Sequence, residues 1–180
     1  KEHLDTLKPI KKLGGRLFFD SRFSNPGANL ATSCAICHVP PFLSSNKQLY
    51  TDSTAVSVIP ANSRGGKVTS VRNTPTLQDA KLLPSLNADG SRNDLDDLVR
   101  NKLVSLHLGW EPGQESQVYN EIHALVLNDQ GFDVFADGTY IEQFKAAADV
   151  NLEALSQEDV IEQVVEALKA YVRGIKSKNT

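Results

Sequence analysis

The amino-acid sequence predicts an all-α fold, and three observations support that prediction. Apolar residues recur in several segments at positions i, i+3, i+4 and i+7, the spacing of one face of a helix. No segment shows the alternating pattern of a strand with comparable strength. The chain has 180 residues, of which 40% are hydrophobic, so it can bury one substantial core. We therefore expect a single helical domain over residues 1–180.

The first expected helix runs from Pro9 to Phe19. Proline suits the first turn of a helix, and apolar residues then follow at helical spacing. Gly14 and Gly15 lower the helix propensity of this segment, so we expect them to allow the close approach of a bulky group.

Four more helical segments are expected after Asn93. They cover residues 95–106, 115–127, 140–148 and 160–172. Gly109 is the expected stop of the first of these, which carries a stripe of leucines. Ser156 and Asp159 approximate a capping box before the last, which is the most amphipathic segment of the chain.

Residues 34–38 read CAICH and hold both cysteines of the chain. The pattern C-x-x-C-H is the attachment signature of a c-type haem, in which each thiol forms a thioether and the histidine reaches the iron. We therefore predict that Cys34 and Cys37 anchor a haem and that His38 is its proximal ligand. The fold prediction becomes a c-type cytochrome domain, with long irregular loops such as residues 40–71 folded around one haem c.

Three other uses of two such cysteines are less favoured. A disulfide between Cys34 and Cys37 would close a very small loop and stabilise the fold little. A thioredoxin-like pair is expected in a β-α-β setting, and no apolar strand precedes residue 34. A tetrahedral zinc site needs two more Cys or His ligands at regular spacing, which this sequence does not offer.

Charge and hydropathy exclude two classes of partner. The net charge is -3 and the Lys and Arg residues are dispersed, so no basic stripe suggests nucleic acid. No apolar run is long enough to span a bilayer.

There is no signal peptide at Lys1. Because haem c is attached outside the cytoplasm, we expect a periplasmic or otherwise exported protein whose mature or trimmed chain starts there.

The sixth ligand of the predicted haem is a separate question. The chain contains no Met, the residue that raises the potential of His/Met cytochromes c. His107 follows the leucine stripe at an apolar helix end. It has three interpretations: an iron ligand, an acid or base in a distal pocket, or a polar residue favoured by the helix dipole. His123 is expected at the surface and Trp110 in the core.

Three ordered strings resemble the N-terminal haem domain of bacterial di-haem cytochrome c peroxidases, a family that includes the methylamine-utilisation enzyme that modifies tryptophans. They are LGGRLFFD at residues 13–20, SCAICH at 33–38 and RNTPTL at 72–77, with weaker similarity at 89–92. Residues 166–171 resemble the helix that ends that domain. The resemblance covers nearly the whole chain. It implies that Arg72 lies near a haem propionate. It also implies that Asn73 matches a position that contributes to a calcium site between two domains.

The sequence departs from this family at several positions. Asn87 or Ala88 stands where the family has a tryptophan between its two haems, and His107 aligns with a glutamate that assists peroxide cleavage. Residues 40–71 contain no histidine, although some members hold a distal histidine there. A second C-x-x-C-H is absent. The calcium site of the family borrows ligands from its second domain, which this sequence lacks, and this speaks against calcium here.

Two functions of different class remain. The first is an electron carrier with one haem held by His38 and His107, which exchanges single electrons with a redox protein, a second haem protein or a second haem domain. The second is a peroxidase-like enzyme that reduces hydrogen peroxide at an open iron position, with His107 moving protons. Because the residues suited to peroxide cleavage are the ones replaced, the sequence favours the electron carrier. A structural or sensor haem domain and a trimmed fragment of a longer chain are further interpretations.

Overall fold

Helices form most of the regular structure in the described residues, which are 2–28, 30–43, 50–51, 58–59, 68–69, 72–87 and 89–177 of this computed structural model. The α-helices are α1 (Glu2–Asp5), α2 (Pro9–Phe19), α3 (Cys34–Cys37), α4 (Leu95–Leu103), α5 (Glu115–Asn128), α6 (Tyr140–Ala148) and α7 (Gln157–Val172). Short 3-10 helices cover Ser21–Phe23, Pro41–Leu43, Ala80–Leu82, Leu106–Leu108 and Leu152–Ala154. Within the described ranges the only strands are β1 (Val58–Ile59) and β2 (Val68–Thr69), which pair antiparallel. The all-α prediction is confirmed.

The predicted helix boundaries agree closely with the structure at most ends. Helices α2 and α6 span the expected residues, and α5 extends one residue further, to Asn128. Helix α7 starts at Gln157, because the Ser156 hydroxyl accepts a hydrogen bond from the Asp159 amide and caps the first turn. The expectation for the loop over 40–71 lies mostly outside the described residues.

The predicted helix over residues 95–106 is wrong at its C-terminal end. Helix α4 stops at Leu103, and a separate 3-10 helix, Leu106–Leu108, follows it. Ser105 separates the two, because its hydroxyl accepts a hydrogen bond from the His107 amide and starts the new turn. Gly109 ends that turn with φ 80°, so it is the stop of the 3-10 helix and not of α4. His107 therefore projects from a short turn.

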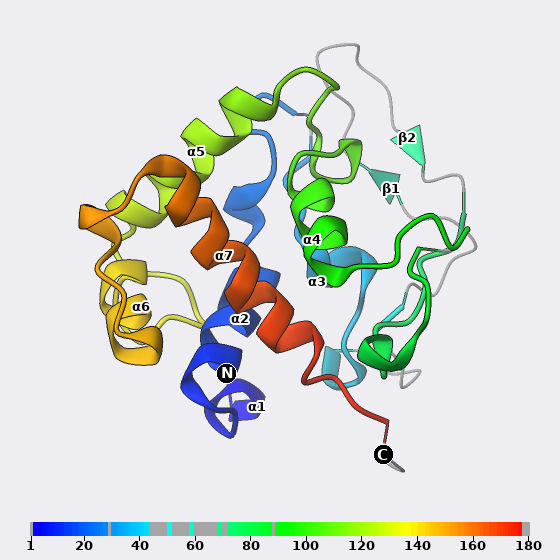
Figure 1. Cartoon of the computed structure of the whole chain (residues 1–180), viewed down its shortest axis with the longest axis horizontal. Helices are drawn as coiled ribbons and strands as arrows, with labels where there is room; N and C mark the ends of the chain where they lie inside the picture. The colour runs from blue at the N-terminus through cyan, green and yellow to red at the C-terminus, as the bar shows by residue number, and fades with distance from the viewer. Residues whose placement is uncertain are drawn as a thin grey trace.

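Helices α2 and α7 form the central pair, with α5 and α6 on one side and α3 and α4 on the other (Figure 1). The two glycines of α2 explain how closely the pair packs. A β-carbon at Gly15 would lie 2.5 Å from a methyl group of Leu4, and one at Gly14 would collide with the backbone of α7. The expected close approach is confirmed, and its partners are α1 and α7.

A buried arginine joins α2 to the segment between α5 and α6. The Arg16 side chain has no exposed surface and pairs with Asp129 at 2.6 Å and Asp133 at 2.6 Å. It also donates to Gln143 at 2.5 Å, and its guanidinium lies 3.8 Å from the centre of the Tyr140 ring. Each donor thus meets an acceptor inside the core, which is the condition for keeping a charge there.

The remaining expectations about the core and surface can be read from the exposed fractions. Trp110 is 1% exposed and its indole nitrogen donates to the Phe23 carbonyl at 3.3 Å, so it lies in the core as expected. His123 on α5 is partly exposed.

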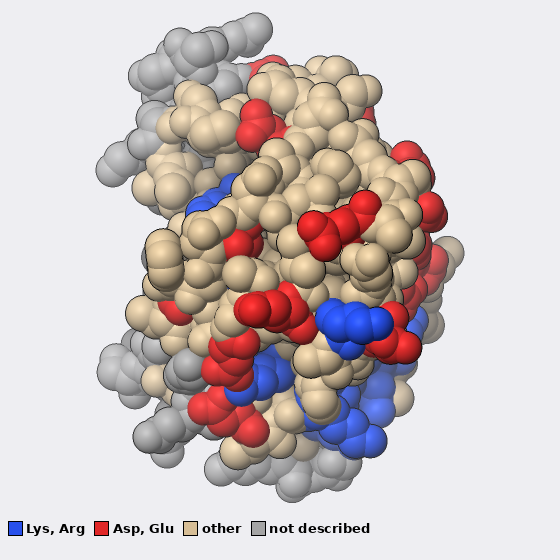
Figure 2. Space-filling view, turned by 90° about the vertical axis from the view of Figure 1, so that its left-hand side faces the viewer, with Lys and Arg blue, Asp and Glu red and all other residues tan. Residues whose placement is uncertain are grey.

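On the face shown in Figure 2, acidic and basic side chains lie close together. No helix in the described part of the chain combines the length and apolarity needed to cross a bilayer.

Candidate functional site

A cavity of about 390 Å³ lies against α3. Its walls come from α2, α3, α4, α7, the 3-10 helix Leu106–Leu108 and the segment over residues 72–87. Most of the lining surface is apolar, from aliphatic side chains and the Phe18 ring, and polar side chains also border the cavity. The volume and the apolar lining with a few polar groups are typical of a cofactor site.

The predicted haem-anchoring residues share one wall of this cavity. Helix α3 is a single turn, and the His38 amide continues it by donating to the Cys34 carbonyl at 2.8 Å. This turn brings Cys34, Cys37 and His38 to the same cavity. No disulfide joins the two cysteines. Burial, with a smaller effect of Cys37, raises the pKa of the Cys34 thiol to about 12, so that thiol is protonated at neutral pH.

The imidazole of His38 is oriented by a backbone carbonyl. Its Nδ1 lies 3.0 Å from the carbonyl oxygen of Tyr50. A carbonyl can only accept, so Nδ1 carries the proton and Nε2 keeps a lone pair. Burial lowers the pKa of His38 to about 4, against the opposing effects of this hydrogen bond and of a second backbone hydrogen bond at Pro75. A neutral imidazole with a free Nε2 is the form that binds a metal.

His107 borders the same cavity from the turn after α4. Its Nδ1 lies 3.3 Å from the Ser105 hydroxyl. Partial burial and then the charge of Lys102 lower the pKa of His107 to about 4. The charge that His107 gains on protonation makes a small contribution to the lowered pKa of His38, after burial and the charge of Lys102.

Arg72 also borders the cavity, but its guanidinium already has a partner. Its Nη1 donates to Asp89 at 2.8 Å, and both side chains are exposed. Hydrogen bonds from Ser91, and then from Arg72, lower the pKa of Asp89 to about 2. The predicted contact of Arg72 with a propionate stays a prediction.

Two residues of this site were missed by the sequence analysis. Lys102 borders the cavity, and it follows Leu95 and Val99 at the i, i+4, i+7 spacing of one helix face. That spacing could have found it. Tyr50 orients His38 from a segment without any periodic pattern, so no local signal pointed to it.

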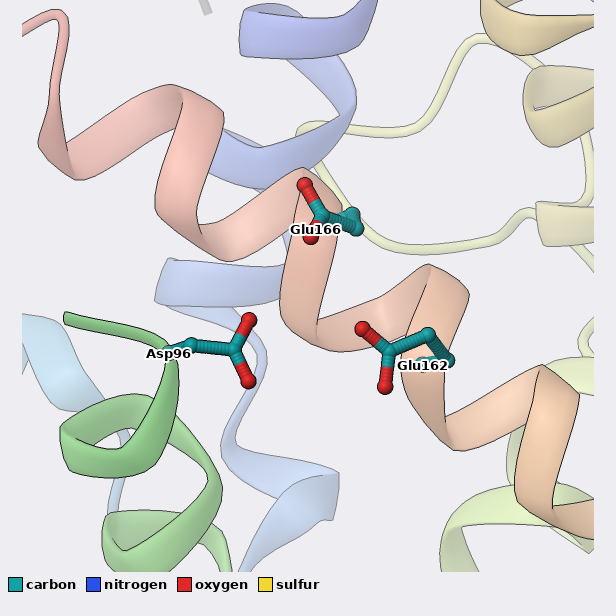
Figure 3. Close-up of side chains that lie close together, drawn as sticks. All are labelled: Asp96, Glu162 and Glu166. Carbon is teal, nitrogen blue, oxygen red and sulfur yellow. The ribbon is translucent and has the colours of Figure 1, made fainter. Parts of the chain in front are cut away.

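Three carboxylates outside the cavity also gather, on α4 and α7 (Figure 3). They belong to Asp96, Glu162 and Glu166. Lys169 pairs with Asp96 and, at 2.5 Å, with Glu166, while Arg100 pairs with Glu162 and, at 3.8 Å, with Asp96. Because each of the three carboxylates pairs with Lys169 or Arg100, the group is an ion-pair network that ties α4 to α7.

The predicted site residues Cys34, Cys37, His38, Arg72 and His107 thus all border one cavity, although their roles stay predictions. Two thiols and a neutral imidazole on one wall of an apolar cavity fit the donor set of a c-type haem.

Comparison with known proteins agrees with this chemistry. A family model described as di-haem cytochrome c peroxidase matches residues 8–180. The comparison with curated proteins gave no match. The family implies a haem c protein with a peroxidase-like or electron-transfer role. Since the match covers almost the whole chain, the resemblance seen in the sequence is confirmed, and the chain belongs to the di-haem cytochrome c peroxidase family.

Proposed function

We propose that this chain is an electron carrier with one haem c, anchored by Cys34 and Cys37 and ligated by His38 and His107. The observation that carries the proposal is that these four residues border one apolar cavity. A haem c bound there supplies a one-electron couple. The function is thus electron exchange with a partner, without chemistry on a substrate.

The residues of the chain have distinct tasks in this proposal. The aliphatic side chains of α4 and α7 would shield one side of a haem from water, which suits a centre that exchanges electrons and not protons. Burial keeps His38 neutral, and the Tyr50 carbonyl orients its ring. His107 has its Nδ1 near Ser105, which leaves its Nε2 for the iron. Two imidazoles in place of a Met/His pair give a low potential.

A peroxidase-like enzyme is the second candidate, and one observation favours it. His107 is exposed although it borders the cavity. A small oxidant can therefore reach this residue from solvent, and a neutral imidazole can accept a proton there. In this alternative, His107 moves protons and does not hold the iron.

The proposal extends to the surroundings of the protein. We propose a redox protein, a second haem protein or a second haem domain as the electron partner, and a periplasmic or otherwise exported location, since haem c is attached outside the cytoplasm. We also propose that the chain forms a single domain. Calcium is not part of the proposal, because Asn73 is exposed and the acidic group on α4 and α7 is already paired with cations.

Haem attachment is tested first. The intact mass should exceed that of the polypeptide by one haem, and the haem should stay with the chain after acid-acetone extraction. The double variant C34S/C37S should lose this covalent attachment. A mass equal to that of the bare chain would contradict the haem c assignment.

The sixth ligand is tested by the ferric absorption spectrum of the haem-loaded protein. We expect a low-spin spectrum that His107→Ala converts toward high spin, with the iron opened to cyanide. His123→Ala is the matched control, because His123 lies on α5 and does not border the cavity. An unchanged low-spin spectrum in His107→Ala removes His107 as ligand. A high-spin unmodified protein that consumes peroxide favours the enzyme.

A further inference from the structure

The carbonyl group that orients His38 belongs to a buried tyrosine with an unusual backbone. Tyr50 is 6% exposed and has φ 56°, in the left-handed region. A bulky residue rarely adopts this conformation, and it persists only where surrounding contacts impose it. His38 has backbone hydrogen bonds at Tyr50 and at Pro75. The direction of the Tyr50 carbonyl, and with it the first of these two bonds, depends on what holds Tyr50.

The Tyr50 side chain is held by the core. Its hydroxyl oxygen lies 3.3 Å from that of Tyr171, and its ring meets the edge of Phe18 with the ring centres 6.4 Å apart. Tyr171 belongs to α7, is 2% exposed and packs against the glycines of α2. The Phe18 and Tyr171 rings lie 5.1 Å apart. The Tyr50 hydroxyl thus meets a side chain that the central helix pair fixes.

The residue after Tyr50 is fixed as well. Thr51 forms an antiparallel bridge with Val39, the residue that follows His38. The Thr51 hydroxyl donates to the carbonyl of Thr74, in the segment that borders the cavity. The peptide unit that carries the Tyr50 carbonyl is therefore anchored on both sides, by α7 and by two neighbouring segments.

We propose that the Tyr50–Tyr171 hydroxyl pair is a positioning element for His38, which links the orientation of the iron ligand to α7. The inference rests on the proposed function, because it takes His38 as the ligand. The pair touches neither substrate nor iron and acts through the Tyr50 carbonyl. A partner on the second nitrogen fixes the ring of a ligating histidine and raises its basicity. Burial raises the pKa of both phenols, so both hydroxyls stay protonated and neutral.

The test uses the haem-loaded protein and the variants Tyr50→Phe and Tyr171→Phe, which remove one hydroxyl each. We expect the His38 Nδ1 proton, observed by paramagnetic NMR, to exchange with solvent about 2- to 10-fold faster, the factor that one ordinary hydrogen bond represents. The reduction potential should rise, because a weaker Nδ1 hydrogen bond makes His38 a poorer donor to the iron. Since either change breaks the same pair, the double variant should equal each single variant.

Tyr140→Phe is the matched control. It also removes a buried hydroxyl, which donates to Asp20 at 2.8 Å, but Tyr140 does not border the cavity. This variant should be less stable, but the exchange rate of the His38 Nδ1 proton and the reduction potential should stay unchanged. Unchanged exchange and potential in haem-loaded Tyr50→Phe and Tyr171→Phe overturn the inference alone. A chain without covalent haem overturns the proposed function and this inference with it.

Discussion

Gly14 on α2 lies so close to Ala167 on α7 that a β-carbon at Gly14 would sit 1.9 Å from the Ala167 carbonyl oxygen. The obstacle is the backbone of a helix, which cannot rotate away as a side chain can. The same hypothetical atom would lie 2.9 Å from the β-carbon of Tyr171. This contact therefore sets the distance between the two central helices and the place of Tyr171, which meets Tyr50.

Gly14→Ala should be strongly destabilising. We expect the free energy of unfolding to fall by about 3 kcal/mol or more, because overpacking of a tight core forces backbone shifts. Denaturant unfolding of the haem-loaded protein measures this loss. Gly27→Ala is the control, because among the described residues a β-carbon at Gly27 meets only the Asn25 side chain, at 3.3 Å. A loss for Gly14→Ala as small as that of the control would contradict the predicted clash.

Arg16→Met should leave buried carboxylates without their main partner. Removal of one member of a buried ion pair typically costs about 3–5 kcal/mol, and Asp129 has no exposed side-chain surface. We therefore expect a loss in that range by denaturant unfolding.

A double-mutant cycle provides the control for the Arg16 prediction. Asp129→Asn removes the stranded charge, so the double variant R16M/D129N should lose less than the sum of the single variants. Arg22 also pairs with Asp129, at 2.9 Å, so the recovery should be partial. Fully additive losses would show that Arg16 and Asp129 are not coupled.

Much of the fold could be predicted because the signals are local. Pro9 and Ser156 mark helix starts by their own chemistry, and apolar spacing identified the helices that carry the core. The break after Leu103 was missed, because the leucine stripe continues through a turn that a Ser105 hydroxyl separates from α4. Apolar periodicity reports only the spacing of side chains along the sequence. It gives no sign of a side-chain hydrogen bond that ends one helix and starts another turn.

The candidate site was predicted only where residues themselves carry chemistry. The cysteines and His38 form a contiguous motif, and His107 stood out as a nitrogen donor at an apolar patch. Tyr50 contributes its backbone carbonyl, a group that every residue possesses, so the residue type gives no sign of this role. The role depends on the contact between Tyr50 and His38, which only the fold creates. The sequence cannot show such a contact.

Acid should weaken the fold through Asp129. Burial acts to raise the pKa of this carboxyl, but hydrogen bonds from Arg22 and Arg16 outweigh it and hold the pKa below its ordinary value. As the pH falls below about 4, the unfolded chain binds a proton before the folded chain does, so stability is full above this pH and is lost below it. Urea unfolding at several pH values measures the slope.

Asp129→Asn should be less stable at neutral pH and less sensitive to acid. Asp149→Asn is the control, because Asp149 is exposed and pairs with Lys145 at the surface, where an ion pair contributes little. An acid slope that Asp129→Asn leaves unchanged would assign the acid sensitivity to other carboxylates.

Lys102 places a positive charge against the cavity, and this charge lowers the pKa of both His38 and His107. A nearby cation favours the reduced state of a haem, because reduction removes one positive charge from the iron. Lys102→Met should therefore lower the reduction potential. The free energy of interaction between this charge and the charge on the iron is on the order of 1 kcal/mol at an effective dielectric constant of about 20. Lys102→Arg keeps the charge and should keep the potential close to that of the unmodified protein. Redox titration of the three haem-loaded proteins decides the matter: equal potentials in Lys102→Met and the unmodified protein would show that Lys102 does not act on the haem electrostatically.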